Sequence, residues 1–137
     1  MRVRKSPPKE FTIDRSEWVA GHNRSNTFTE EFSRDINVGL SSLLNENEYA
    51  CCLGFYSHAC GVPWDAMYDV GGPGNLPNDI VVPLLNDEEE EIETEFAVRC
   101  MEINDDSDIP EKVREKAIKK MFKEKGVKVK FVGRYAK

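Results

Sequence analysis

The sequence has no long hydrophobic run, and its basic start is not followed by an apolar segment. None of the apolar stretches among its 137 residues approaches the roughly 20 residues that cross a bilayer. Residues 1–8 are basic, but the apolar core of a secretory signal does not follow them. These absences predict a cytoplasmic protein without a membrane partner, whose four cysteines stay reduced.

The motifs of common metal and phosphate sites are also missing. Zinc ligands are normally paired as Cys-x-x-Cys or His-x-x-x-His, and the chain contains neither pair and only two histidines. The glycine-rich segment 71–75 lacks the Lys-Ser/Thr ending of a phosphate-binding loop. We therefore expect no metal and no cofactor.

Charge is abundant but unevenly distributed. The net charge is -6, yet residues 86–108 hold eleven acidic side chains and one basic one, and residues 109–137 hold eleven basic and three acidic ones. Because opposite charges attract, we expect these two segments to lie near each other. The acidic balance argues against nucleic acid as a partner, since carboxylates repel phosphates. The basic block can present a face to an anionic partner.

Length and composition predict a small α+β fold, with about three helices packed on a short β-sheet in one domain, residues 11–137. Residues 1–10 are predicted to form a flexible basic arm, because prolines interrupt regular structure there. Runs of β-branched and aromatic residues predict short strands at 11–13, 80–82 and 127–131. Asp14 is predicted to cap a brief helical turn that anchors Trp18 in the core.

Helical spacing of apolar residues predicts the three helices. Residues 51–60 carry one apolar stripe, and Gly61 is a natural terminator. Residues 87–103 fit both helical spacing and strand alternation, and we favour a helix capped by Asp87. The last helix is predicted to start at a cap on Asp108 and to stop at Gly126. Its expected apolar face is Ile109, Val113, Ala117, Met121 and Phe122.

Three of the four cysteines lie within residues 51–60, in the most apolar part of the sequence. Buried thiols behave as small hydrophobic groups, and we expect the cluster to be structural. The alternative is a thiol nucleophile near a helix N-terminus, where the helix dipole lowers a thiol pKa. Residues 51–64 resemble the nucleophile helix of NlpC/P60-type cysteine peptidases, which would make Cys52, or else its neighbour Cys51, the nucleophile. No histidine follows at a suitable distance, so this hydrolase alternative needs His22 as its base.

Arg15 and Trp18 flank one short turn beside the long polar segment 22–38. Arginine and tryptophan are enriched at binding hot spots, and binding residues concentrate on loops held by a rigid scaffold. We therefore take Arg15 and Trp18 as the candidate ligand-binding residues, although a core position for Trp18 and an ion pair for Arg15 remain alternatives.

Several short motifs resemble a family of small uncharacterised proteins carried by bacteriophages and prophages. They are Thr12-Ile13-Asp14-Arg15-Ser16-x-Trp18, Cys51-Cys52-Leu53-Gly54-Phe55, Cys60-Gly61 and Ile103-Asn104-Asp105. The resemblance implies a phage-encoded protein in the host cytoplasm but no activity. With it, we expect a non-enzymatic accessory protein that binds a host protein or a small anionic ligand, in host takeover or counter-defence. The alternatives are the cysteine hydrolase and a structural or assembly protein of the particle.

Overall fold

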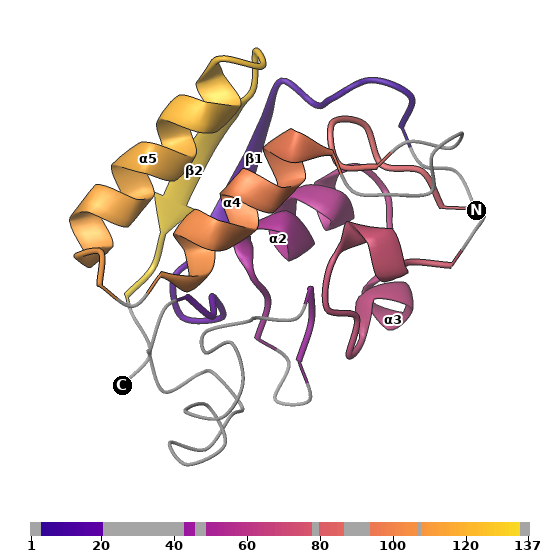
Figure 1. The fold of residues 1–137 in the computed structure, drawn as a ribbon, viewed down its shortest axis with the longest axis horizontal. Helices are drawn as coiled ribbons and strands as arrows, with labels where there is room; N and C mark the ends of the chain where they lie inside the picture. Colours follow the sequence, from indigo (N-terminus) through magenta and orange to yellow (C-terminus); the bar gives the residue numbers. More distant parts are fainter. Residues whose placement is uncertain are drawn as a thin grey trace.

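The computed structural model describes residues 4–20, 43–45, 49–77, 80–86, 94–106 and 108–134. These residues form a small α+β domain, as predicted (Figure 1). Its elements are β1 (Glu10–Asp14), α2 (Cys52–Ala59), α3 (Trp64–Met67), the 3-10 turn Pro73–Asn75, α4 (Glu95–Asp105), α5 (Glu111–Lys123) and β2 (Lys128–Val132).

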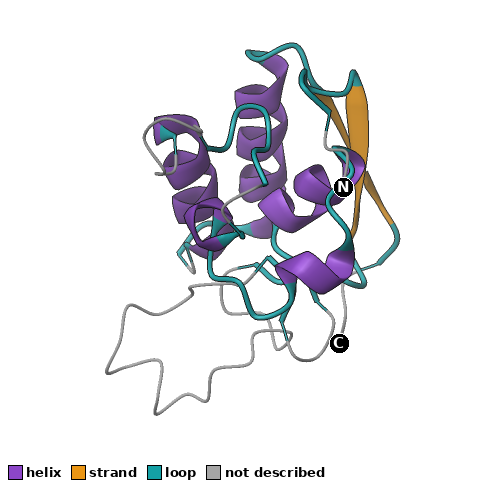
Figure 2. Cartoon of the chain, turned by 90° about the vertical axis from the view of Figure 1, so that its right-hand side faces the viewer, coloured by secondary structure: helices purple, strands orange, loops and turns teal. Residues whose placement is uncertain are grey.

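Strands β1 and β2 pair in parallel, with Glu10 opposite Lys128 and Asp14 opposite Val132. Nearly the whole chain separates the two strands. The inner face of this small sheet carries buried apolar side chains such as Phe11 and Val129, and the outer face carries exposed polar ones. Figure 2 shows the two strands on one side of the molecule and the helices on the other. The predicted strands at 11–13 and 127–131 are therefore confirmed, and the lysines of β2 face outward.

Three aromatic rings join the sheet to two helices. Phe11 of β1 meets Tyr56 of α2 and Phe122 of α5 edge to face, with ring centroids 5.4 and 4.9 Å apart. Tyr56 and Phe122 complete the triangle at 5.2 Å. Edge-to-face pairs at this spacing are favourable beyond their burial. This cluster fixes α2 and α5 against the inner face of the sheet.

Helices α2 and α5 end where glycine was expected to stop them. After α2, Gly61 N–H donates to the His58 carbonyl and Val62 N–H donates to Ser57. After α5, Gly126 and Val127 donate to Lys123 and Phe122 in the same pattern. Both glycines have positive φ, 108° and 81°, which L-residues with a Cβ rarely adopt. The predictions at Gly61 and Gly126 are confirmed.

The buried face of α5 differs from the predicted one. The helix begins at Glu111 after Pro110, so Asp108 is not its cap. Its buried residues are Arg114, Ile118 and Phe122, and Val113 is 52% exposed. The Arg114 guanidinium lies inside because it donates to the backbone carbonyls of Ile103, Asp106 and Ile109. Arg114 therefore takes a core position because carbonyls at and just after the end of α4 accept its hydrogen bonds. A search for apolar periodicity does not find such a position.

Three other expectations need correction. Asp14 caps a turn, since its carboxylate accepts from the Ser16 amide and hydroxyl and its carbonyl accepts from Glu17 N–H, but residues 15–17 form a hydrogen-bonded turn and not a helix. Residues 80–82 are not a strand, and Val82 N–H instead donates to the Asn86 side chain at 2.7 Å. The helix expected at 87–103 is present as α4, but its cap is Thr94. Residues 87–93 lie outside the described residues.

The expected arm contacts the domain from Arg4 onward. Arg4 N–H donates to the Cys60 carbonyl at 2.8 Å, and Pro8 is buried. The Lys9 carbonyl then accepts from Lys128 N–H, which extends the β1–β2 ladder by one residue. This segment therefore brings Lys9 to the end of the sheet.

Candidate functional site

Trp18 lies in the core and has no exposed surface. Its indole Nε1 donates to the Asn104 side-chain oxygen at 2.8 Å, and its ring lies 5.2 Å from the Phe131 ring. Asn104 is itself fully buried, at the end of α4. Trp18 is therefore a core residue, which was the alternative to a binding role. Its ring has no exposed face for a ligand at the surface.

Arg15 holds three parts of the fold together. Its Nε and one terminal nitrogen donate to the two carboxylate oxygens of Glu115, at 2.9 and 2.8 Å. The other terminal nitrogen donates to the Gly133 carbonyl at 3.1 Å. The two-pronged pair links the turn after β1 to α5, and its side chains are 26% and 13% exposed. The Arg15 guanidinium therefore binds Glu115 in the same two-pronged way in which it would bind the carboxylate or phosphate of a ligand.

The four cysteines are buried free thiols, as the structural interpretation predicted. Burial raises the pKa of the Cys51 and Cys100 thiols from 9.0 to about 12 and that of Cys60 to about 11, and it raises the pKa of Cys52 strongly. Cys100 of α4 lies next to Cys52, and its carbonyl oxygen is 3.9 Å from the Cys52 sulfur. Raised pKa values leave these groups as neutral thiols at neutral pH, and a nucleophile needs the thiolate.

His58, the histidine that the structure describes, is engaged away from these thiols. The His58 ring stacks on Trp64 with centroids 4.4 Å apart, and its Nδ1 lies 3.2 Å from the Val62 carbonyl. His22 lies outside the described residues. No group of three or more potential metal ligands occurs in the described parts of the chain. The geometry thus gives the cysteine-hydrolase alternative no support.

An open groove of about 450 Å³ lies where α5, β1 and β2 meet. Four lysines line it: Lys9 before β1, Lys119 and Lys123 on α5, and Lys128 at the start of β2. Gly126, Val127 and Val129 are the other described residues of its lining, and both valines are buried. We call this feature the lysine groove.

No acidic side chain is among the described residues that line the lysine groove. Two acids are adjacent in sequence to lining lysines, Glu10 to Lys9 and Glu124 to Lys123, and neither is among the described lining residues. Glu10 lies 3.6 Å from Lys130, which does not line the groove. Lys119 also contributes to the fold, since its ammonium lies 5.7 Å from the Phe131 ring centroid. The groove therefore concentrates positive charge above an apolar floor.

Sequence reasoning found only part of this site. The sequence indicates a basic face of the last helix at Lys119, Lys120 and Lys123, and two of these three, Lys119 and Lys123, line the groove. Lys9 and Lys128 carry no local signal, because only the pairing of β1 with β2 brings the start of the domain to its end. A charge count along the chain therefore finds the helix but not the groove.

Comparison of the chain with models of protein families, with curated proteins and with solved structures gave no match. Within the described residues, no helix combines the length and apolar character needed to cross a membrane.

Proposed function

We propose that this chain is a non-enzymatic binding protein that holds an anionic partner in the lysine groove. The groove itself carries the proposal: four lysines converge on about 450 Å³ with no acidic residue among the described lining. The phage-type accessory role is part of the proposal and rests on the sequence resemblance. In that role the partner is the acidic surface of a host protein or a small anionic ligand.

The residue types in the groove determine what it recognises. Lysine ammonium groups are point charges, and they lack the planar fork by which arginine binds carboxylates and phosphates in a fixed orientation. Neither arginine nor an aromatic ring is among the described lining residues. The groove therefore suits a flexible anion with several charges, and a nucleobase would have no ring to stack on. Binding should weaken as salt screens the charges over about 8–10 Å.

The state of the thiols supports a binding role over catalysis. All four are buried and stay protonated at neutral pH, because burial raises their pKa values. Catalysis by Cys51 or Cys52 would require opening the core around α2. The basic groove, by contrast, is open to solvent as it stands.

The test is a titration with two probes, inorganic tripolyphosphate and a short polyglutamate peptide, at low salt. The double variant Lys119→Gln/Lys123→Gln should weaken binding at least tenfold, about 1.4 kcal/mol. Calorimetry measures the affinity, and circular dichroism checks that the variant is folded.

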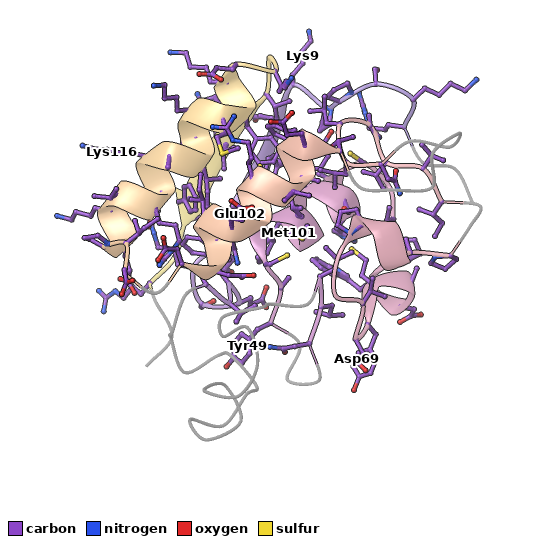
Figure 3. All side chains as sticks on the ribbon, viewed as in Figure 1. Lys9, Tyr49, Asp69, Met101, Glu102 and Lys116 are labelled. Carbon is purple, nitrogen blue, oxygen red and sulfur yellow. The ribbon has the colours of Figure 1, made fainter. Side chains whose placement is uncertain are left out.

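The matched control is Lys112→Gln/Lys116→Gln. Both control lysines lie on the same helix and do not line the groove, and Figure 3 shows Lys116 on the middle of α5, away from the end where Lys9 lies. The control changes the net charge equally and should cost less than about threefold. Equal losses in the two double variants, or no binding of either probe, would overturn the proposal.

A further inference from the structure

A second cavity, of about 270 Å³, lies away from the lysine groove and has the opposite character. It is lined by Glu17 from the turn after β1, Leu44, Ala50, Phe55 of α2 and Trp64 of α3. Four of these five described lining residues are apolar, and the only charged group among them is a carboxylate. We call this feature the aromatic cavity.

The aromatic wall of this cavity is held in place by its neighbours. Phe55 and Trp64 meet edge to face, with centroids 5.9 Å apart at an interplanar angle of 85°. On Trp64, the His58 ring stacks at 4.4 Å and 19°. Phe55 is buried and Trp64 half-buried, so the indole is fixed on two sides and still reaches the cavity. An aromatic face with fixed orientation is what a cation needs for a favourable contact with the ring quadrupole.

The backbone that carries the Glu17 carboxylate is held by the fold, and the side chain itself is exposed to solvent. Glu17 N–H donates to the Asp14 carbonyl at 3.0 Å, and the Glu17 carbonyl accepts from Ala50 N–H at 2.8 Å. The Glu17 side chain forms no ion pair within the described residues. A negative charge therefore stands at an apolar, aromatic cavity, and the described residues supply no counter-ion for it.

We propose that the aromatic cavity binds an organic cation, with an alkyl-guanidinium or alkyl-ammonium group between the Glu17 carboxylate and the Trp64 ring. The carboxylate neutralises the charge, the indole contacts it through its π face, and Leu44 and Ala50 cover an alkyl stem. Such a cation is either a free small amine or a basic side chain of a polypeptide, and the two share this chemistry. This inference is independent of the lysine groove and of its anionic partner.

The two tryptophans make the proposal measurable by fluorescence. Trp18 is fully buried and Trp64 lines the cavity, so a ligand in the cavity changes the emission of Trp64 alone. The probes are N-acetyl-arginine methylamide, its uncharged isostere N-acetyl-citrulline methylamide, and agmatine as a free cation. We expect saturable changes with the arginine probe and a citrulline affinity at least fivefold weaker. Saturation by agmatine at equal affinity assigns the site to free cations, and a clear preference for the arginine probe assigns it to polypeptide side chains.

Two variants separate a cation site from a merely apolar one. Glu17→Gln keeps the size of the side chain and should weaken arginine-probe binding at least fivefold without changing citrulline binding. The control Glu111→Gln removes one negative charge from an exposed position at the start of α5 and should change neither. Equal affinity for the charged and uncharged probes, no effect of Glu17→Gln, or no saturable signal with any probe would refute the proposal.

Discussion

Removing the side chain of Asn104 should lower the free energy of unfolding strongly, because this one side chain makes four hydrogen bonds at the core. The Asn104 oxygen accepts from Trp18 Nε1 at 2.8 Å and from Cys52 N–H at 3.0 Å, and its amide donates to the Val19 carbonyl at 3.0 Å. The amide also donates to the Asp105 carboxylate. Asn104 thus ties the end of α4 to the start of α2 and to the segment after β1.

Asn104→Ala would remove the Asn104 hydrogen bond of three polar groups in the core: the Trp18 indole N–H, the Cys52 amide and the Val19 carbonyl. All three residues are fully buried. Each unsatisfied buried group costs about 1–3 kcal/mol, so we expect a loss of about 3–6 kcal/mol after partial relaxation. Domains of this size are stable by only about 5–15 kcal/mol, so the variant should be close to unfolding.

The assay is urea unfolding followed by circular dichroism, in which a lower midpoint at unchanged slope reports lost stability. The matched control is Glu102→Ala, two residues earlier on α4 at an exposed position, labelled in Figure 3. It should change the free energy of unfolding by less than about 0.5 kcal/mol. If Asn104→Ala costs no more than the control, the three buried groups find other partners and the reasoning fails.

The other predictions concern the thiols, one close contact and one ion pair. The free energy of unfolding should hold below pH 9 and then fall by about 1.4 kcal/mol per pH unit for each thiol, because the unfolded chain ionises near 9.0 and the folded thiols only near 11–12. A flat profile up to pH 10.5 contradicts this. Gly54→Ala should cost about 3 kcal/mol or more, because its Cβ would lie 2.0 Å from the Leu43 carbonyl oxygen, whereas Gly126→Ala, in open space at φ +81°, should cost about 1–2 kcal/mol. Equal costs would show that the contact relaxes. A double-mutant cycle on Arg15 and Glu115 should give a coupling of about 1 kcal/mol, and no coupling would restore Arg15 as a candidate for ligand binding.

Local features of this chain were readable from its sequence because neighbouring residues produce them. Gly61 and Gly126 end helices since the backbone there needs a positive φ, whatever surrounds it. The alternation of valine and lysine in residues 127–130 places apolar and charged side chains on opposite faces of any strand. The spacing of the cysteines with Phe55 and Tyr56 likewise indicated a buried helix. The single apolar stripe expected there is wrong, because every residue from Cys52 to Ser57 is buried and Ala59 is exposed.

The candidate sites depend on contacts between residues far apart in the chain, and the sequence alone does not specify them. Arg114 takes a core position because carbonyls at and just after the end of α4 accept hydrogen bonds from its guanidinium. The buried face of α5 therefore differs from the one that its apolar residues predict. The parallel pairing of β1 with β2 places Lys9 beside Lys128 and so forms the lysine groove. Composition, spacing and glycine positions determined the elements of this protein, since those depend on short-range sterics and periodicity. Its tertiary structure decided which charges meet, because that depends on how distant elements pack.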